Sequence, residues 1–137
     1  MIFVDTSAWL ALYDRKDQNH RTAREVAEYL RESRVPLVTT DYIFDETVTI
    51  VRRRVGHREA VAFGEALLKS SVVRLVEIDG VLRRRAWDIF VKYGDQRFSY
   101  TDCTSFVVMQ HMGIIEFLDT TGTLRCWDSC LCLRSER

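Results

Sequence analysis

Short apolar segments typical of buried strands alternate with longer segments of helical period along most of the chain. The strand-like segments are residues 2–4, 35–40, 72–78 and 114–118. The helical segments cover residues 6–14, 19–32, 41–55, 57–70, 79–94 and 101–113. Strands separated by helices favour parallel pairing, with helices on both faces of the sheet. The pattern therefore predicts an α/β sandwich with a central, mainly parallel sheet.

Individual residues mark the ends of several predicted elements. Asn19 and Asp79 stand where helix N-caps are expected, and Gly94 stands where the helix that begins after Asp79 is expected to end. Pro36 fits only at the start of its strand, because it lacks the N–H that a central ladder position needs.

Length and composition favour a single domain covering residues 1–137. Hydrophobic residues make up 47% of the chain and proline occurs once, which disfavours long disordered stretches. Twenty basic and 20 acidic residues balance, so affinity for nucleic acid would have to come from a local patch. The acids within the first 20 residues and the short apolar runs disfavour a signal peptide or membrane span, and we expect a cytoplasmic protein.

Three of the four cysteines, Cys126, Cys130 and Cys132, lie close together near the end of the chain. Their spacing does not give the paired C-x-x-C arrangement of zinc sites, and the three histidines are far apart in the sequence. We therefore expect free thiols in a reducing compartment.

Acidic residues stand where parallel sheets bind their ligands, beyond the carboxyl ends of strands. Asp5 follows the first predicted strand and Asp119 the last, while Asp102 lies at the start of a helix. Glu46 lies in the first turns of another helix, next to Asp45, which should face solvent. The four acids could converge on one crevice. Each also has a simpler explanation, as a helix cap or as a surface acid.

Clustered carboxylates repel one another unless a cation lies between them. Mg²⁺ and Mn²⁺ prefer oxygen ligands and are the usual cations at such sites. One or two such ions, held against a phosphate, would activate water and stabilise the leaving oxygen. The acids therefore indicate phosphoester hydrolysis.

Three stretches, "FVDTSAWLALYD", "DETVTIV" and "FSYTDCTSFVVMQHMGI", closely resemble the three sequence blocks of PIN-domain ribonucleases, particularly the VapC-type toxins of prokaryotic toxin–antitoxin pairs. The resemblance runs from residue 1 to about residue 117 and rests on the order and spacing of the blocks. It implies a PIN-like three-layer α/β/α sandwich. It also implies a Mg²⁺- or Mn²⁺-dependent endoribonuclease that hydrolyses RNA phosphodiester bonds.

The resemblance also implies roles for individual residues. Asp5, Glu46 and Asp102 match the first three catalytic, metal-binding acids of the family. The supporting residues are Thr6 and Ser99, which match hydroxyl positions that orient these acids, and Asp95, which matches an acid often seen ahead of the third block. The implied partners are an RNA substrate, a second copy in a homodimer, and a cognate antitoxin whose tail inserts near the acids.

The chain departs from the family after Leu118. The family usually shows an acid and then a short segment of Asp, any residue, His and Phe, whereas this chain reads "FLDTTGTLRCWDSCLCLRSER". One hypothesis is a change of reading frame, because permitted codons for "DTTGTL" encode Tyr-Asp-Arg-His-Phe in the neighbouring frame. Asp119 would then substitute for the fourth catalytic, metal-binding acid, one or two residues early. Residues from about 119 to 137 would form an atypical tail, out of frame and either disordered or loosely packed.

Two other functions and one surface feature stay open. The altered last segment favours a catalytically weakened domain that only binds its antitoxin, a second copy or RNA. A phosphatase with Asp5 as nucleophile is disfavoured, because Ser7 stands where a second Asp is typically needed. The arginines at 52–54 and 83–85 would contact RNA phosphates or form solvated helix faces, and the second interpretation is favoured.

Overall fold

The structure is a computed structural model and describes residues 1–119, 121 and 124–126. Its strands are β1 (Ile2–Val4), β2 (Leu37–Thr40), β3 (Val73–Val76), β4 (Glu116–Leu118) and β5 (Leu124–Cys126). Its helices are α1 (Thr6–Tyr13), α2 (His20–Glu32), α3 (Asp41–Arg54), α4 (His57–Lys69), α5 (Gly80–Lys92) and α6 (Tyr100–Met112). The predicted alternation of strands and helices up to residue 118 is confirmed.

The strands form one sheet in the order β3-β2-β1-β4-β5. β1 lies in the middle and pairs in parallel with β2 and β4, so that Phe3 faces Val38 on one side and Phe117 on the other. β3 continues the parallel pairing at one edge, and β5 pairs with β4 in antiparallel orientation at the other. The predicted mainly parallel sheet is confirmed.

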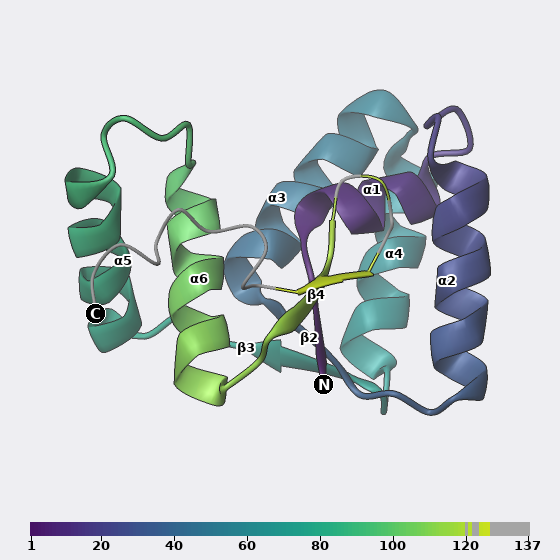
Figure 1. Cartoon of the computed structure of the whole chain (residues 1–137). Helices are drawn as coiled ribbons and strands as arrows, with labels where there is room; N and C mark the ends of the chain where they lie inside the picture. Colours follow the sequence, from purple (N-terminus) through teal and green to yellow (C-terminus); the bar gives the residue numbers. More distant parts are fainter. Residues whose placement is uncertain (120, 122–123, 127–137) are drawn as a thin grey trace.

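The helices cover both faces of this sheet. Figure 1 shows α5 and α6 on one side of the strands and α1, α2 and α4 on the other, with α3 beside α1 and α4. Buried Phe63 of α4 and Val107 of α6 belong to the same hydrophobic core as Phe3 of β1. The predicted three-layer α/β/α sandwich is confirmed.

Core packing and buried hydrogen bonds hold α1 at the end of the sheet where β1 and β2 finish. The ring of Phe63 lies 5.7 Å from that of Trp9 and 5.1 Å from that of Tyr13. The indole N–H of Trp9 donates to Thr39 Oγ1 at 3.3 Å, and the Thr39 hydroxyl donates to the carbonyl of Val4 at 3.0 Å. These buried hydrogen bonds fix α1 against the ends of both strands, because breaking them would leave buried polar groups unsatisfied.

The predicted helix ends hold in part. The Asp79 carboxylate accepts from Leu82 N at 2.9 Å, as expected of an N-cap. Asn19 stands at the N-cap position of α2 but makes no side-chain cap hydrogen bond. The prediction that Gly94 ends α5 is wrong, because the backbone leaves helical geometry one residue earlier, at Tyr93.

The fifth strand was not predicted from the sequence. Its three residues, "LRC", contain no β-branched side chain, and they become a strand by pairing back onto β4. Of the predicted atypical tail, the structure describes Asp119, Thr121 and β5. The expected out-of-frame, disordered or loosely packed character otherwise concerns residues 120, 122–123 and 127–137, which lie outside the described residues.

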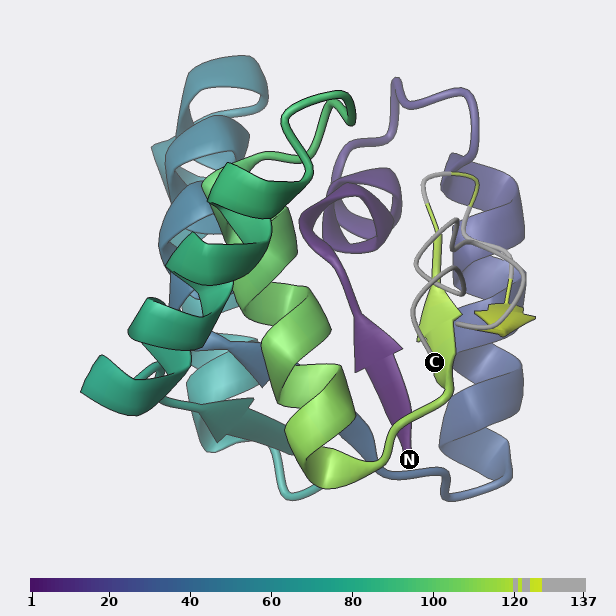
Figure 2. The ribbon, with the colours of Figure 1, turned by 60° about the vertical axis from the view of Figure 1, so that its left-hand side comes forward.

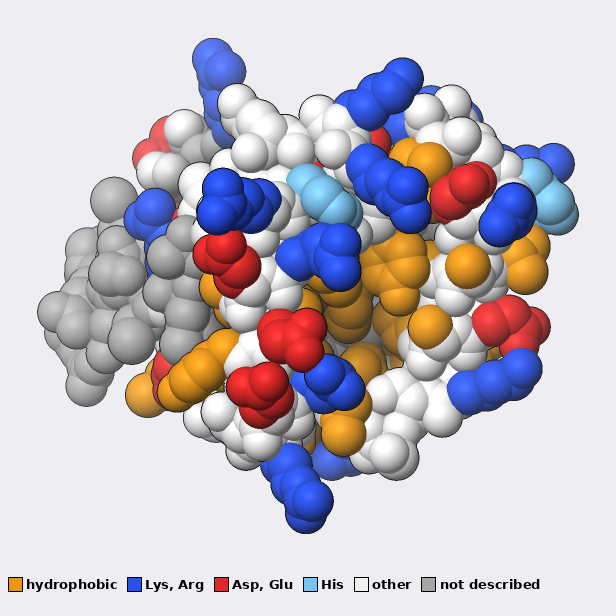
Figure 3. Space-filling model, turned by 90° about the vertical axis from the view of Figure 1, so that its right-hand side faces the viewer, with side chains coloured by type: hydrophobic (Ala, Val, Ile, Leu, Met, Phe, Trp, Pro, Cys, Tyr) orange, Lys and Arg blue, Asp and Glu red, His pale blue; other side chains and the backbone are white. Residues whose placement is uncertain are grey.

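An apolar groove lies on the face formed by α2 and α4 and is visible in Figure 3 as a hollow lined with hydrophobic side chains. Its volume is about 300 Å³. Its lining includes Trp9 and Leu12 of α1, Leu30 of α2 and Phe63 of α4, and Arg34 also borders it. Within the described part of the chain, no helix has the length and apolar character needed to cross a membrane.

Candidate functional site

Asp5 lies directly between β1 and α1, and Figure 2 shows how the strand leads straight into the helix. Its backbone is extended, and it acts as the N-cap of α1, with Oδ1 accepting from Thr6 N at 2.8 Å. This bond explains why no loop is needed between strand and helix, because the carboxylate itself satisfies a free N–H of the first turn.

Thr6 links this junction to α3. Its side chain is buried, and its hydroxyl donates to Glu46 Oε2 at 3.2 Å. Glu46 is half-buried, as expected for the edge of the core, whereas Asp45 is exposed, as predicted. The Thr6 hydroxyl therefore binds the Glu46 carboxylate, and Thr6 directly follows Asp5, which carries the second carboxylate.

Asp102 lies in the first turn of α6 and is held by a reciprocal capping box. Ser99 Oγ accepts from Asp102 N at 3.0 Å, and Asp102 Oδ2 accepts from Ser99 N at 2.9 Å. Both bonds satisfy N–H groups that the helix start leaves unpaired. The Ser99 hydroxyl therefore fixes the start of the helix that positions Asp102.

The pKa of Asp5 depends on its burial and on the charges of two other acids. Burial is the largest cause that raises this pKa, to about 6 from 3.8, and the Thr6 N–H opposes the shift. The negative charges of Asp102 and Glu46 raise it further. The carboxylates of Glu46 on α3 and Asp102 on α6 thus both act on Asp5, which follows the carboxyl end of β1.

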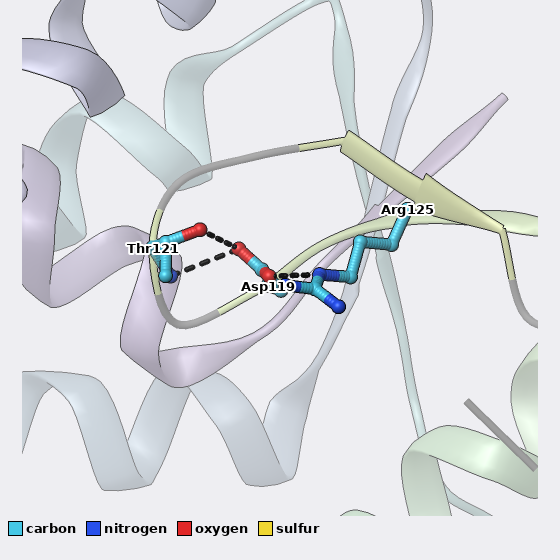
Figure 4. A network of polar contacts seen from close by, with 3 residues as sticks. All are labelled: Asp119, Thr121 and Arg125. Atoms are coloured by element: carbon cyan, nitrogen blue, oxygen red, sulfur yellow. Dashed lines mark hydrogen bonds and ion pairs between the residues drawn. The ribbon is translucent and has the colours of Figure 1, made fainter. Parts of the chain in front are cut away.

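Asp119 and Asp95 have other surroundings. Figure 4 shows the Asp119 carboxylate between Thr121 and Arg125: Oδ1 accepts from Thr121 N at 2.9 Å and from Thr121 Oγ1 at 2.6 Å, and Oδ2 pairs with Arg125 Nε. Asp95 is exposed after α5, and its Oδ2 accepts from Gln96 Nε2 at 3.4 Å.

The donor chemistry suits a hard divalent cation, since carboxylate oxygens are the ligands that Mg²⁺ and Mn²⁺ prefer. A cation bound there would favour the ionised form of Asp5 and so oppose the rise in its pKa. Among the described residues, no three His, Cys, Asp or Glu side chains are close enough to share one metal ion. Binding therefore requires the carboxylates to turn towards a common centre.

An open groove that includes Glu46 lies between α3 and the start of α6. It is lined by Asp41, Tyr42, Asp45, Glu46, Thr49, Ile50, Arg53 and Thr101. Arg53 therefore lies in a groove that also contains Glu46. Of the second arginine run, Arg83 donates to the carbonyl of Ile78 at 2.8 Å and Arg84 pairs with Asp88 at 3.7 Å.

Sequence reasoning missed two features next to this groove. Asp41 directly follows β2, and its Oδ1 accepts from Ile78 N at 3.0 Å. The rule that selected Asp5 would have found it, because both acids stand at the end of a parallel strand. Tyr42 and Tyr100 face each other with ring centroids 6.1 Å apart, a contact between α3 and α6 that no local sequence signal indicates.

Comparison with known proteins identifies the family of this chain. A family model for the PIN domain matches residues 2–122. The 23S rRNA-specific endonuclease VapC20 of Mycobacterium tuberculosis, found in two strains, is 42% identical over 115 residues, which cover 83% of this chain and 84% of VapC20. The crystal structure of VapC20, described as a sarcin–ricin loop cleaving toxin, superposes with a TM-score of 0.77 at 39% identity. That match covers 85% of this chain and 87% of VapC20.

The family resemblance inferred from the three sequence blocks is thereby confirmed. The model match spans most of the chain, and the solved relative has the same layered fold. The chain belongs to the PIN-domain family and is a VapC-type member of it.

Proposed function

We propose that this protein is a metal-dependent endoribonuclease of the VapC toxin type. The observation that carries the proposal is the half-buried Asp5 carboxylate at the β1–α1 junction, which Thr6 joins to Glu46 by a 3.2 Å hydrogen bond and whose pKa is raised by burial and by the charges of Asp102 and Glu46. If Asp5 served only as the N-cap of α1, it would not need two further carboxylates nearby. The similarity to an endonuclease favours a catalytic domain over one that only binds.

We infer that Asp5, Glu46 and Asp102 hold Mg²⁺ or Mn²⁺ and are the catalytic acids. Their carboxylate oxygens and the repulsion that Glu46 and Asp102 exert on Asp5 support this assignment. When bound, the cation would lower the pKa of a coordinated water and stabilise charge on the leaving oxygen. The Thr6 hydroxyl orients Glu46, and Ser99 orients Asp102 through the capping box.

We further propose that Asp119 completes this set as the fourth acid. It follows β4, the strand next to β1, which places it at the same end of the sheet as Asp5. In the structure its charge is balanced by Arg125, so the proposal requires that ion pair to open when metal binds. Asp95 is proposed only as a supporting residue, in the segment that leads to Ser99.

The proposed substrate is RNA of the class that VapC20 cleaves, a sarcin–ricin loop of 23S rRNA. The similarity over more than four fifths of both chains supports this choice. A ribosomal substrate also supports the cytoplasm as the place of action. Arg53, in the groove beside Glu46, is placed to contact a phosphate of such an RNA.

A cognate antitoxin and a second copy of the chain are the proposed protein partners. The apolar groove on the α2–α4 face suits an apolar segment of an antitoxin, and α1 connects this groove to the acids, with Asp5 at its N-cap and Leu12 in the groove. Co-purification with the product of a neighbouring antitoxin gene tests the first partner. Light scattering of the purified chain tests the homodimer.

The nuclease itself is tested with an RNA stem-loop that carries the sarcin–ricin sequence. We expect a single main cut with Mg²⁺ or Mn²⁺ and none in EDTA. Equal cleavage with and without EDTA would contradict the metal-dependent mechanism.

A further inference from the structure

An exposed cluster of aromatic side chains lies on α5 and the start of α6. Trp87 and Phe90 are 52% and 40% exposed, and their rings stack with centroids 5.6 Å apart and planes at 21°. Tyr100 meets both rings edge-on, at 6.4 and 6.3 Å, and Tyr42 of α3 lies 6.1 Å from Tyr100. Trp87, Phe90 and Tyr100 thus contact one another, and Tyr42 extends the group from Tyr100; the four residues are called the aromatic platform below.

The hydrophobic core does not account for the whole of the aromatic platform. Among the described residues, Tyr42 and Tyr100 pack against the core, whereas Trp87 and Phe90 belong to no core cluster. The hydroxyl of Tyr100 donates to the carbonyl of Arg83 at 3.0 Å, which fixes the ring between the core and the exposed pair. Stacked aromatic rings left in solvent are typical of binding surfaces.

The aromatic platform begins at the acids. Tyr42 precedes Glu46 by one turn of α3, and Tyr100 stands two residues before Asp102 on α6. Tyr42 and Glu46 line the same open groove, together with Arg53. A chain of nucleotides lying across the acids would therefore meet aromatic rings on leaving the groove.

The charges on helix α5, at the exposed end of the aromatic platform, suit a polyanion, whereas Asp41, Asp45 and Glu46 line the groove at the Tyr42 end. Helix α5 carries four cations, Arg83, Arg84, Arg85 and Lys92, against one acid, Asp88. A second copy docked here about a two-fold axis would bring the same cations of both copies together, because such an interface pairs one patch with itself. RNA phosphates would instead be attracted.

We propose that the aromatic platform is the binding site for an unpaired nucleobase of the RNA substrate, with Trp87 as its outermost stacking surface. The proposal rests on the ribonuclease function proposed above. Proteins that recognise RNA by sequence mostly bind single-stranded loops, whose splayed bases stack on aromatic side chains. The platform offers such a surface next to the acids, and it would fix the position of the loop relative to them.

Binding is measured first, in EDTA, so that the RNA stays intact. The probe is a labelled stem-loop with the sarcin–ricin sequence, titrated with the wild type, Trp87→Ala, Trp87→Phe and Tyr29→Ala. Tyr29 is the matched control, an aromatic residue of α2 that is 66% exposed. We expect Trp87→Ala to weaken binding by on the order of 10-fold, the usual effect of losing one stacked base. Trp87→Phe and Tyr29→Ala should bind nearly as the wild type does.

A second titration separates stacking from a general loss of affinity. Single abasic sites are placed in turn at the unpaired positions of the loop. At one loop position, removing the base should weaken binding to the wild type by the same factor as Trp87→Ala weakens binding to the intact loop. Removing that base should not weaken binding to Trp87→Ala any further. In cleavage assays Trp87→Ala should raise KM and leave the dependence on metal unchanged, since it touches none of the acids.

Three results would overturn the stacking site. Equal binding by Trp87→Ala and the wild type would remove Trp87 from RNA recognition. If the abasic site and Trp87→Ala each weaken binding by a factor that does not depend on the other, at every loop position, a direct stack between Trp87 and a base is excluded. A lower mass of Trp87→Ala in light scattering, with its melting temperature unchanged, would show that the platform joins copies of the chain. Because binding is measured without metal, Trp87-dependent binding without any cleavage by the wild type would contradict the nuclease and keep the stacking site.

Discussion

The hydroxyl of Thr6 donates a 3.2 Å hydrogen bond to the carboxylate of Glu46, and this contact joins two residues that are 40 positions apart in the sequence. Thr6 begins α1 and Glu46 lies on α3, so the bond couples the strand-end acid Asp5 to the acid of the neighbouring helix. Because Thr6 is buried, its hydroxyl has little alternative to this partner. The distance between the two acids therefore depends on a residue that is not itself an acid.

Replacing Thr6 tests this coupling. Thr6→Val keeps the shape of the side chain but removes the donor, so Glu46 loses its orienting bond. We expect metal affinity and cleavage to fall by roughly 10-fold or more, the usual effect of losing a hydrogen bond to a metal ligand. Manganese titration calorimetry and initial cleavage rates measure the change. Thr6→Ser should recover most of the loss, and an equally poor Thr6→Ser would show that the methyl group matters and not the hydroxyl.

Asp5 should destabilise the metal-free protein at neutral pH. Its pKa is higher in the folded protein, about 6, than the ordinary value of 3.8, so the folded state binds the proton more tightly. The contribution of Asp5 to the free energy of unfolding therefore falls as the pH rises from about 4 to about 6, by up to about 3 kcal/mol.

The matching variant is Asp5→Asn, which stays neutral and keeps an acceptor for Thr6 N. In EDTA it should be more stable than the wild type at pH 8, and the difference should disappear near pH 3. Urea unfolding at both pH values measures this. Adding Mn²⁺ at pH 8 should stabilise the wild type only, and stabilisation of both proteins would mean that the cation binds elsewhere.

The Ser99 hydroxyl should contribute to both stability and activity. Ser99→Ala removes the acceptor for Asp102 N, which should lower the free energy of unfolding by about 1 kcal/mol. It should also lower the cleavage rate, because Asp102 loses half of its capping box. Ser71→Ala, at an exposed serine before β3, is the control. Normal cleavage by Ser99→Ala at reduced stability would limit Ser99 to a structural role.

Arg125 should compete with metal for Asp119. Removing the guanidinium in Arg125→Ala should strengthen Mn²⁺ binding and raise the cleavage rate, because Oδ2 of Asp119 would lose its ion pair with Arg125. Arg74→Ala removes the same charge from β3, the opposite edge strand, and should change neither property. If both variants behave as the wild type does, Asp119 is not part of the metal site.

The parts of the fold that follow local patterns were predictable from the sequence. Strand β1 and helix α1 were evident because an apolar run changes to helical period at Asp5. Asp5 itself was identified by its place at a strand end. By contrast β5 is only three residues long and exists through its pairing with β4, so its own residues carry no strand signal.

The contacts between helices were not predictable from the sequence. The bond from Thr6 to Glu46 and the ring pair of Tyr42 and Tyr100 depend on how α3 packs against α1 and α6. The family resemblance indicated that Thr6 orients an acid, but it did not show which carboxylate receives the hydrogen bond. The pairing of Asp119 with Arg125 was likewise absent from the sequence argument, because it needs the unpredicted strand β5.

The most direct test of the central claim compares two neighbouring acids of α3. Glu46→Gln and Asp45→Asn each remove one negative charge, but only Glu46 is bound by Thr6, and Asp45 is exposed. The measurement is the initial rate of cleavage of the sarcin–ricin stem-loop with Mn²⁺. The account predicts that Glu46→Gln cleaves no faster than the wild type in EDTA and that Asp45→Asn cleaves as the wild type does with Mn²⁺. Cleavage by Glu46→Gln at the wild-type rate would contradict it.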